Sequence, residues 1–550
     1  MSESGTFDYI IVGAGSAGCV LANRLTENPS TTVCLLEAGP PDKSIYIHVP
    51  TGVIKTAHLD SINWRYFSKP QETMGGRPIF TPRGKTLGGT SSINGMVYMR
   101  GNPLDYDEWA ALGNDGWSWA DVRPYFLKSE NNEQFGNGEH HNSGGPLNVT
   151  LPNITSPLQR DFVAAAESLQ YKHNPDFNGD HQEGFGQHQV TQKNGRRWSA
   201  AMAFLRPATN RPNLTVLTDA PVARLTIEDS RATGVELIDG RHLSANGEVL
   251  LCAGTIVSPK ILMQSGIGDA AELKAVGIEP IANLPGVGKN LQDHAASAVI
   301  MRTKSRTPWG FSWAKAPSLA FDALRYLTAR KGFFAAQLIE SGGFIKTSPD
   351  LDRPDIQFVF VPGHRAPPPK VIEVGHGYSC FAVLLRPKSR GTVTLASADP
   401  AAAPVIDPCF YTEEEDMKLM LKALKENRRL TNADAFKKYE PYEVMPGDKV
   451  QSDDALEEYI RNTGGTIFHP VGTCKMGRDD TAVVDERLRV YGLDGLRIVD
   501  ASIMPLICGG NTNAPVIMFG EKASDMIKED AGRAVRLGTG NIAPSESRAA

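Results

Sequence analysis

The chain has 550 residues, enough for two or three domains, and its 41% hydrophobic and 22% charged residues are typical of a folded globular protein. The formal net charge of −5 gives no electrostatic basis for nucleic-acid binding. No apolar run of about 18 residues is present, so we expect no integral membrane segment.

The N-terminus is polar and runs directly into an apolar stretch, without the basic and apolar regions of a secretory signal. The seven cysteines are scattered and mostly lie in apolar contexts, and neither they nor the histidines show the spacing of a metal site. We therefore expect buried reduced thiols, no metal ion and a cytoplasmic location.

Residues 7–39 predict a strand, a glycine-rich turn, a helix and a second strand. The apolar run 9–12 precedes Gly13-Ala14-Gly15-Ser16-Ala17-Gly18, a helical pattern covers 17–25, and the apolar run 33–36 ends at Glu37. This βαβ pattern is typical of a site for an adenine dinucleotide. The alternative is a glycine turn in some other α/β sheet, and the pattern alone does not separate NAD from FAD.

Each residue of this motif has an expected task. Gly13 allows the tight turn, Gly15 lets the backbone approach a pyrophosphate, and Gly18 lets the helix lie against the sheet. The helix N-terminus offers free N–H groups to the phosphates. Glu37 follows near the usual offset of about 20 residues and can accept the ribose hydroxyls. The flanking residues expected beside the same cofactor are Ser16, Ala17 and Ala38.

Residues 40–83 show no clear periodicity, and we interpret them as an irregular cover over the nucleotide. The loop 84–95 is rich in glycine and small hydroxyl residues, so its backbone N–H groups can crowd a polar ligand. A glycine-rich surface loop is the alternative. It is disfavoured because the loop runs into the apolar residues 96–99, which we expect to begin a helix or strand. The loop residues expected at the cofactor are Gly88, Gly89, Thr90, Asn94 and Gly95.

The middle of the chain predicts mixed structure. The aromatic residues of 102–130 indicate packing, and 131–195 indicates solvated loops with one helix near 156–170. Short apolar runs at 214–217, 223–227, 234–237 and 248–252 predict a sheet inserted into an α/β domain, with Val222 at the cofactor. Segment 254–268 predicts a helix with Ser258 as N-cap, Pro259 as first residue and Gly266 as its stop.

From about 300 to 460 the pattern changes to strands at 356–360 and 392–395 and helices near 319–330 and 413–430. The segments 303–317 and 365–377 are expected to be long loops, for which a lid and a variable surface loop are equal alternatives. The last 20 residues lack apolar patterning and predict disorder.

The segment 464–527 carries the second group of candidate residues. His469 lies between an apolar run and a proline that favours an extended backbone, although a satisfied core histidine is the usual explanation for a single histidine. A strand at 496–499 ends at Asp500. Asn513 is a good N-cap for a helix over 516–527, whose positive end would stabilise an anionic reduced flavin ring.

Several long motifs resemble those of the glucose–methanol–choline (GMC) oxidoreductases, a family of FAD enzymes. They are the segments 84–94, with Tyr98, Gly101 and Asp107 downstream, and 254–268, 286–294 and 469–473. The similarity covers about residues 7–530, and the bacterial choline- and alcohol-dehydrogenase branch is the most similar.

The resemblance implies an α/β fold (α+β overall), in which an FAD-binding Rossmann-like domain is interleaved with a substrate domain built on an antiparallel sheet. The FAD-binding parts are expected at 1–155, 196–300 and 464–530, and the substrate parts at 156–195 and 301–463. Residues 531–550 form the expected disordered tail.

The resemblance also implies roles for individual residues. His469 takes the place of the catalytic histidine and Asn513 that of its partner, while Asn94 lies beside the reactive edge of the flavin. Asp500 and Ala501 would contact the ribityl and pyrophosphate part. Some members tether the flavin through a histidine where this chain has Ile93, so non-covalent FAD is expected. His294 is expected to be structural, at a helix edge.

The implied reaction is oxidation of a primary alcohol to an aldehyde. His469 would take the hydroxyl proton, Asn513 would hold the oxygen, and the hydride would pass to flavin N5. Glu340 is either an acid in the substrate cavity, favouring a cationic alcohol such as choline, or half of a structural ion pair. No aromatic cage for trimethylammonium is evident, which favours a neutral aliphatic or aromatic alcohol.

The alternative functions are a choline-type dehydrogenase, an oxidase using O₂, a lyase that keeps FAD as structure, a non-catalytic binding module and an NAD enzyme. The electron acceptor is expected to be O₂ or a quinone. The expected assembly is a monomer or dimer.

Overall fold

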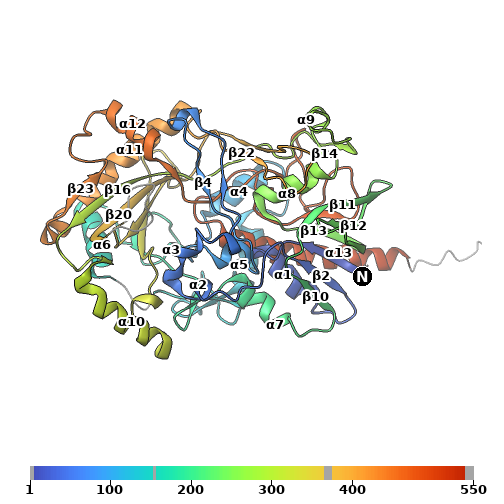
Figure 1. Cartoon of the computed structure of the whole chain (residues 1–550), viewed down its shortest axis with the longest axis horizontal. Helices are drawn as coiled ribbons and strands as arrows, with labels where there is room; N and C mark the ends of the chain where they lie inside the picture. The colour runs from blue at the N-terminus through green and yellow to red at the C-terminus, as the bar shows by residue number, and fades with distance from the viewer. Residues whose placement is uncertain (1–4, 153–155, 365–373, 539–550) are drawn as a thin grey trace, which may run out of the picture.

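The computed structural model describes residues 5–152, 156–364 and 374–538, and two large sheets organise them. Figure 1 shows the N-terminal strands at one end of an elongated molecule and the sheet formed by the middle of the chain at the other end. The mixture of helices and strands confirms the predicted α/β class.

The first sheet is the predicted dinucleotide sheet. Its strand order is β10 (Leu214–Leu217), β2 (Val33–Leu36), β1 (Gly5–Val12), β13 (His242–Leu251), β12 (Arg231–Leu237) and β11 (Val222–Glu228). The pairs β10–β2, β2–β1 and β1–β13 are parallel, whereas β11, β12 and β13 pair antiparallel. β25 (Leu496–Ile498) adds to β13 in parallel. Strand β2 is buried along its whole length, as a central parallel strand requires.

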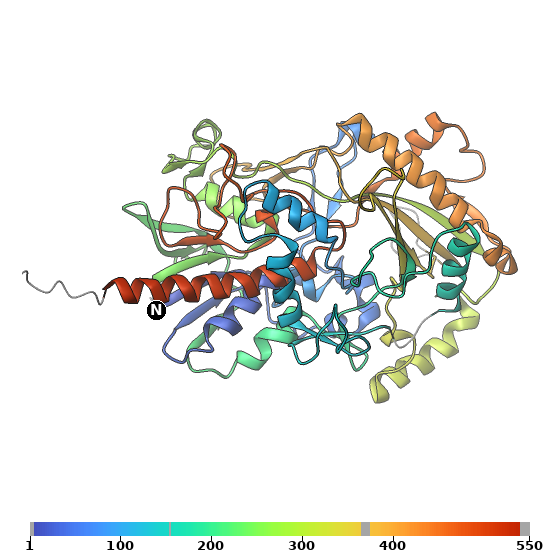
Figure 2. The same ribbon diagram turned by 180° about the vertical axis from the view of Figure 1, so that it is seen from behind.

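Two helices from opposite ends of the chain pack together beside this sheet. α1 (Ser16–Leu25) lies along α13 (Asn513–Gly538), as both views show (Figures 1 and 2). A Cβ on Gly520 of α13 would come within 2.8 Å of the Val20 Cβ of α1, so the two helices approach closely. Arg24 Nη2 and Glu521 Oε1 form an ion pair of 2.8 Å across the contact.

The helices α4 (Pro103–Ala111) and α5 (Trp119–Ser129) and the turn between them carry the aromatic cluster of the N-terminal third. Trp109 and Trp117 are fully buried, and the Trp117 ring meets the Phe519 ring of α13 edge to face at 5.6 Å. The predicted packing role of these aromatics is therefore confirmed.

The second sheet is antiparallel throughout. Its order is β23 (Tyr442–Met445), β16 (Ala295–Thr303), β20 (Gly375–Leu384), β19 (Ile356–Val361), β18 (Ser341–Ile345) and β7 (Gly184–Gln187). The short strands β17 (Gly310–Phe311) and β24 (Gly465–Thr466) pair with β20 and β16. A core cluster packs side chains of this sheet against α6 (Pro157–Ser168), α11 (Glu414–Thr431) and α12 (Asp453–Thr463), with Phe162 stacked on Phe360 at 4.4 Å.

Smaller elements connect these layers. The helices are α2 (Ile45–His48), α3 (Val53–Thr56), α7 (Arg206–Ala208), α8 (Gly254–Gln264), α9 (Ala270–Ala275) and α10 (Ala316–Ala329). The short strands are β3 (Tyr66–Phe67), β4 (Phe80–Thr81), β5 (Glu130–Asn132), β6 (Leu147–Val149), β8 (Gln192–Lys193), β9 (Arg196–Arg197), β14 (Ile267–Gly268), β15 (Ala282–Asn283), β21 (Thr392–Thr394) and β22 (Val405–Asp407).

Several local predictions were wrong. α8 begins at Gly254, so Ser258 and Pro259 lie inside the helix rather than at its start. Residues 96–99 form neither a helix nor a strand, and Val97 makes only an isolated bridge with Val190. Residues 375–377 belong to β20, and 365–373 of the predicted loop lie outside the described residues. α13 continues through 538, so the predicted disorder is wrong for 531–538, and 539–550 lie outside the described residues.

The predicted solvated region 131–195 contains a buried polar network. His141 Nδ1 lies 2.9 Å from Glu130 Oε1, and His141 Nε2 lies 2.8 Å from Asp176 Oδ2. Arg100 Nη2 donates to Glu130 Oε2 at 2.6 Å. Burial without these partners would be costly, so the network explains how charged groups are held inside this region.

The described residues bear on three further expectations. Six of the seven free cysteines are buried and Cys409 is partly exposed. No helix in the described part of the chain has both the length and the apolar character needed to cross a bilayer. Strand β16 crosses the predicted domain boundary at residue 300, and β24 from the third predicted FAD-binding part joins the second sheet. The division into domains stays a prediction.

Two glycines within helices provide a test of the close contact between α1 and the glycine-rich turn that precedes it. A Cβ on Gly18 of α1 would lie 2.0 Å from the Gly13 carbonyl oxygen, whereas a Cβ on Gly532 of α13 would meet no atom of the described residues within 4 Å. Both substitutions to alanine gain helix propensity of up to about 1 kcal/mol. We expect Gly532→Ala to raise the apparent melting temperature and Gly18→Ala to lower it, because overpacking costs about 1–3 kcal/mol. A Gly18→Ala protein as stable as the parent would contradict the described contact.

Candidate active site

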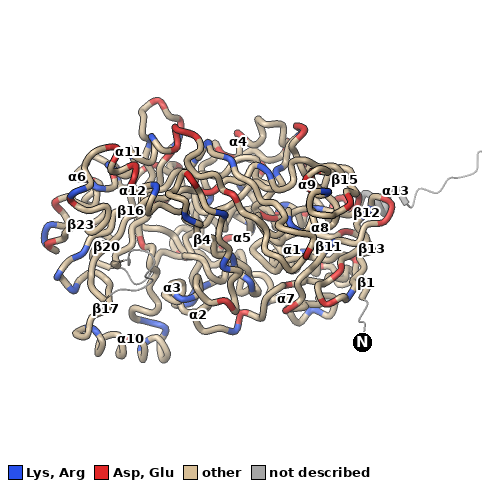
Figure 3. Tube along the Cα trace, turned by 45° about the horizontal axis from the view of Figure 1, so that its top comes forward, with Lys and Arg blue, Asp and Glu red and all other residues tan. Residues whose placement is uncertain are grey.

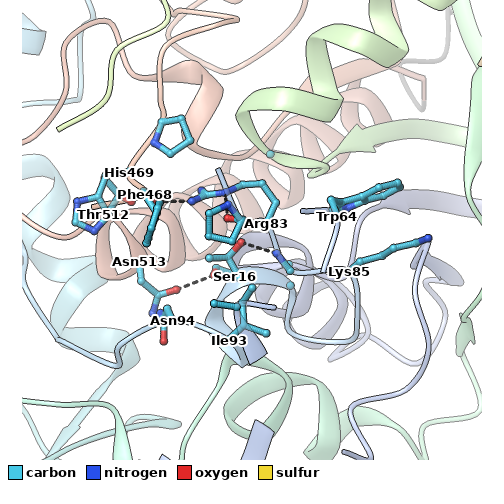
Figure 4. Close-up of a pocket in the computed structure, with 18 of the residues that line it drawn as sticks. Ser16, Trp64, Arg83, Lys85, Ile93, Asn94, Phe468, His469, Thr512 and Asn513 are labelled. Atoms are coloured by element: carbon cyan, nitrogen blue, oxygen red, sulfur yellow. Dashed lines mark hydrogen bonds between the residues drawn. The ribbon is translucent and has the colours of Figure 1, made fainter. Parts of the chain in front are cut away.

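A cavity of about 770 Å³ lies between the two sheets. The dinucleotide sheet contributes the ends of its parallel strands, with Val12, Leu36 and Cys252 in the wall. The antiparallel sheet contributes Val359 and Phe381 from the opposite side. Figure 4 shows polar side chains from the N-terminal and C-terminal parts of the chain converging on this space.

Nearly all of the predicted cofactor residues line this cavity. Gly18 and Gly88 do not line it and lie behind the wall, where Gly18 packs on the Gly13 carbonyl and the Gly88 N–H donates to the Ala14 carbonyl at 2.7 Å. The lining residues among those predicted are Gly13, Gly15, Ser16, Ala17, Glu37, Ala38, Gly89, Thr90, Asn94, Gly95, Val222, Asp500, Ala501 and Asn513, together with His469.

At the dinucleotide end, backbone packs on backbone. Gly13 has a φ of +105°, and a Cβ there would lie 2.6 Å from the Cys252 carbonyl oxygen. A Cβ on Gly89 would lie 2.8 Å from Gly15 Cα. On Gly15 itself a Cβ would meet only the Cys252 oxygen, at 3.7 Å, so this backbone stays open to the cavity. Among the described residues no side chain caps α1, so its first N–H groups remain available to an anion.

Two carboxylates are fixed at this end. Glu37 accepts the N–H of Ala14 at 3.2 Å and that of Gly39 at 2.9 Å, and burial raises its pKa to about 7. Asp500 accepts the Ser258 hydroxyl at 2.6 Å and the Gly254 N–H at 2.8 Å. Burial also raises the pKa of Asp500. The predicted capping serine therefore anchors the acid at the end of β25 instead.

The glycine-rich loop is held by a buried arginine. Arg197 Nη1 donates to Asn94 Oδ1 at 2.7 Å and to the Ser91 carbonyl at 3.2 Å. Burial lowers the pKa of Arg197 to about 9. The Met96 N–H donates to the same Asn94 oxygen at 3.0 Å, so the Asn94 side chain has a fixed orientation at the cavity wall.

His469 is presented by a strained turn. Phe468, directly before it, has a φ of +71°, a conformation that is costly for a bulky residue. The His469 N–H donates to Asp293 Oδ1 at 2.7 Å, and the same carboxylate accepts the Thr466 hydroxyl at 2.6 Å. Arg83 Nη2 donates to the Phe468 carbonyl at 2.6 Å (Figure 4). These bonds over-determine the turn and fix the position of the imidazole.

The hydrogen bonds of the His469 ring define its tautomer. His294 Nε2 lies 3.1 Å from the Leu385 carbonyl, which can only accept, so this nitrogen carries the proton. Burial lowers the pKa of His294 to about 4, so its Nδ1 is an unprotonated acceptor at neutral pH. His469 Nδ1 lies 2.9 Å from that atom and therefore donates, which leaves His469 Nε2 with a lone pair.

The electrostatic environment keeps the His469 ring neutral. Burial, then the neighbouring His294 and Arg83, lower its pKa well below 6.5. The Asn511 amide nitrogen lies 3.1 Å from His469 Nε2, the geometry expected when that ring nitrogen accepts. The site therefore presents an unprotonated imidazole nitrogen at the cavity wall.

His294 is the main residue whose position the sequence misjudged. It was expected to be structural, at a helix edge, but it directly precedes strand β16 and its ring contacts His469. The available signal was a histidine placed immediately before a long apolar run, which indicates a buried ring in need of a polar partner.

The structure brings Asn511, not Asn513, into contact with His469. Asn513 Oδ1 instead accepts the Ser16 hydroxyl at 2.8 Å, which joins the N-termini of α13 and α1 at the cavity (Figure 4). Since the amide oxygen is used there, the Asn513 Nδ2 group is the donor that can serve a ligand. Asn513 is also the first helical residue rather than the predicted N-cap.

Other lining residues were not predicted. Lys85 lies over the Trp64 ring at 4.7 Å, and burial lowers the pKa of His188 to about 4. The segment 303–317, predicted as a long loop, forms β17 and a short 3₁₀ turn, and contributes Trp309 and Phe311 to the wall. Lys85 lies at the start of the predicted glycine-rich loop, so the basic character of that end of the loop could have identified it from the sequence.

Glu340 follows neither of its two predicted roles. It is fully buried and is not among the residues that line the cavity. Within the described residues its carboxylate has no cationic partner and accepts the Ser156 N–H at the start of α6, at 2.8 and 2.9 Å. Burial raises the pKa of the Glu340 carboxyl to about 8, against the opposing effect of that N–H.

The raised pKa of Glu340 predicts how the stability of the protein changes with pH. Its folded-state pKa of about 8 lies above its ordinary value of 4.5, so its contribution to stability is complete below pH 4.5 and is lost as pH rises towards 8. Glu340→Gln has no such loss. We expect the stability difference between variant and parent to shift in favour of the variant from pH 5 to pH 8, by up to about 1.4 kcal/mol per pH unit.

Urea unfolding at several pH values measures this difference. The change of this stability difference with pH is the relevant measurement. The amide of the variant forms hydrogen bonds of its own, which alter the difference by the same amount at every pH. A pH-independent difference would contradict a buried, protonated carboxyl.

Comparison with known proteins agrees with this geometry. Two family models for GMC oxidoreductases match residues 7–296 and 387–520. An alcohol dehydrogenase (acceptor) of Pseudomonas putida is 45% identical over 526 residues, covering 95% of each chain. An oxygen-dependent choline dehydrogenase of Brucella suis biovar 1 is 42% identical over 525 residues, covering 94% of this chain and 95% of the relative.

Among solved structures, pyridoxine 4-oxidase from Mesorbium loti matches with a TM-score of 0.86 and 32% identity, covering 95% of this chain and 99% of that chain. The sequence and structural similarities therefore extend through both sheets and the residues between them. The chain belongs to the GMC oxidoreductase family.

Proposed function

We propose that the protein is an FAD-dependent oxidoreductase that converts a primary alcohol to an aldehyde, with His469 as proton acceptor. The observation that carries the proposal is the unprotonated Nε2 atom of His469 at the cavity wall, oriented by His294 at 2.9 Å. The named relatives, an alcohol dehydrogenase and a choline dehydrogenase, act on alcohols and support the reaction class.

The residues present fit FAD. The open Gly15 backbone, the uncapped start of α1 and the Glu37 carboxylate suit the pyrophosphate and ribose, and they lie in one cavity with His469. Gly254 has a φ of +82°, and a Cβ there would point into open space. This open space in the cavity wall can accommodate a bulky ligand. When bound, FAD would supply a hydride acceptor at N5.

His469 would act on the hydroxyl proton of the substrate. Its Nε2 lone pair contacts the Asn511 amide at 3.1 Å, so an alcohol hydroxyl would replace that donor when it binds. Because Nδ1–H is held by His294, the ring cannot present the wrong nitrogen. The strained turn at Phe468 fixes the imidazole before substrate arrives, which reduces the entropy lost on reaching the reactive geometry.

Asn513 would hold the alcohol oxygen. Its Oδ1 is bonded to Ser16, so its Nδ2 group is the one that can donate to an oxygen in the cavity. The N-terminus of α13 adds a partial positive charge at the same point, which stabilises negative charge developing nearby. Asn511 and Asn513 thus have separate roles, one at the imidazole and one at the substrate oxygen.

The wall of the cavity favours a neutral alcohol over a cationic one. Among the described lining residues the acids are Glu37 and Asp500, both at the dinucleotide end. The opposite wall is apolar, with Ile339, Val359 and Phe381. Glu340, the acid predicted for a cationic substrate, does not reach this space. We therefore infer an aliphatic or aromatic primary alcohol, with O₂ or a quinone as electron acceptor.

We also propose that FAD is bound without a covalent bond. The position at which some family members carry a tethering histidine is Ile93, an apolar side chain on the cavity wall that offers no nucleophile. Acid precipitation should release all yellow colour into the supernatant. Flavin retained in the washed pellet, or a tryptic peptide carrying flavin mass, would contradict this proposal.

The function is tested by mixing the FAD-loaded protein anaerobically with a panel of primary alcohols and recording loss of the flavin absorbance. We expect bleaching by at least one neutral alcohol. His469→Ala should retain the flavin spectrum but slow the bleaching by about 10²-fold or more, the usual contribution of a general base. Air admitted afterwards separates the acceptors, since hydrogen peroxide forms only if O₂ is used.

A matched variant separates chemistry from folding. Glu340→Gln lies outside the cavity, so it should bleach at the parental rate. Flavin that no alcohol bleaches would favour a lyase with structural FAD, and a His469→Ala protein with normal bleaching would remove His469 from the mechanism.

A further inference from the structure

Helix α10 carries an apolar face that the described protein does not cover. Phe321, Leu324 and Leu327 are 61%, 57% and 65% exposed, and Trp313 just before the helix is 91% exposed. Tyr326 is the buried residue of this helix. A surface helix of a globular protein normally turns its apolar stripe inward, so this arrangement is reversed.

The exposed residues form one stripe. Positions 321, 324 and 327 follow one another at intervals of three, which places them along one side of an α-helix. Phe311, in β17 at the start of the same segment, and Val374, its bridge partner, are also exposed. An exposed apolar patch of this kind marks an interaction site.

The segment that carries this stripe is strongly basic. Residues 302–331 contain seven lysines and arginines and a single acid, Asp322, in a chain with a formal net charge of −5. Figure 3 shows basic positions along and beside α10. The seven basic residues are Arg302, Lys304, Arg306, Lys315, Arg325, Arg330 and Lys331.

The helix also adjoins the candidate active site. Trp309 and Phe311 precede α10, Phe333 follows it, and all three line the cavity. Figures 1 and 2 both place α10 at the outer edge of the end formed by the antiparallel sheet, far from the end of α13. A surface that covered α10 would therefore lie beside the cavity.

We propose that α10 and Trp313 bind the surface of a bilayer that contains anionic lipid, with the helix lying in the interface. The features required for such binding are an apolar stripe that includes tryptophan, phenylalanine and leucine, and basic residues around it. Both are present in residues 313–331. The helix spans 14 residues, which is too short to cross a bilayer and suits an interfacial position.

The positive charge around α10 favours an anionic lipid surface over a second copy of the chain as its partner. In a symmetric dimer through α10, the same basic residues would meet each other, and like charges across an interface oppose association. An anionic lipid surface instead attracts each lysine or arginine by about 1 kcal/mol within a Debye length. The combination of apolar stripe and basic rim therefore matches phospholipid headgroups and acyl chains.

Binding in this orientation would bring the cavity wall to the membrane. Resting on the proposed alcohol oxidation, we infer that the substrate or electron acceptor can pass between the bilayer and the cavity beside Trp309 and Phe311. This consequence deepens the proposed function, whereas membrane binding itself does not depend on which reaction the site performs.

The test is sedimentation of the FAD-loaded protein with sucrose-filled vesicles. Vesicles of phosphatidylcholine and phosphatidylglycerol in equal amounts should bind it, pure phosphatidylcholine vesicles should bind it at least about tenfold less, and about 0.5 M salt should release it. The double variant Leu324→Glu/Leu327→Glu should lose at least about tenfold of the binding, because it removes apolar contact and adds repulsion.

The matched control is Leu112→Glu/Ile281→Glu. These residues are similarly exposed, at 51% and 57%, and the change in net charge is identical, but neither lies in residues 302–331. This control should bind like the parent. Bleaching of the flavin by a water-soluble alcohol should be unchanged in both variants, so a failure of membrane binding is distinguishable from a failure of the proposed function.

Three results would overturn the proposal. Parent protein that stays in the supernatant with anionic vesicles excludes the lipid surface. Equal loss of binding in the control double variant would assign the effect to net charge alone. A parent that is dimeric by light scattering and a Leu324→Glu/Leu327→Glu variant that is monomeric would assign the stripe to a second copy of the chain.

Discussion

The structure depends on close packing of backbone on backbone around one end of the cavity. Cβ atoms at Gly13, Gly18 and Gly89 would lie 2.6, 2.0 and 2.8 Å from neighbouring backbone atoms, distances that no side chain permits. The three contacts join the turn after the first strand to the end of β13, to the first helix and to the glycine-rich loop, and so form one surface. Because this surface carries few side chains, its N–H groups and the start of α1 can approach a pyrophosphate directly.

The proton acceptor is positioned by a different device. His469 follows a residue at a φ of +71°, and such a conformation persists only where surrounding bonds compensate for it. Asp293, Thr466 and Arg83 supply these bonds, while His294 determines which nitrogen of the His469 ring faces the cavity. One group of neighbouring residues therefore fixes the backbone at 468–469, and His294 fixes the tautomer of the His469 ring. Neither effect depends on the presence of a substrate.

The elements encoded by short-range patterns were predictable from the sequence. The βαβ unit, Glu37 and the strand ending at Asp500 depend on spacing over a few residues, and the structure places them as expected. Ser258 was misjudged because a local capping rule competed with a hydrogen bond to Asp500, 242 positions away. His294 and Asn511 were missed for the same reason, since the fold selects their contact with His469 across 175 and 42 positions.

The candidate site is assembled from the two ends of the chain, and this couples cofactor binding to catalysis. The Ser16 hydroxyl bonds Asn513, and Arg24 pairs with Glu521, each across 497 positions. β25 joins the dinucleotide sheet by pairing with β13, which itself pairs with β1. The segment that docks in this way also carries Asp500 and the N-terminus of α13. A ligand that binds the assembled site therefore stabilises the docked C-terminal segment, and with it the surroundings of His469, by mass action.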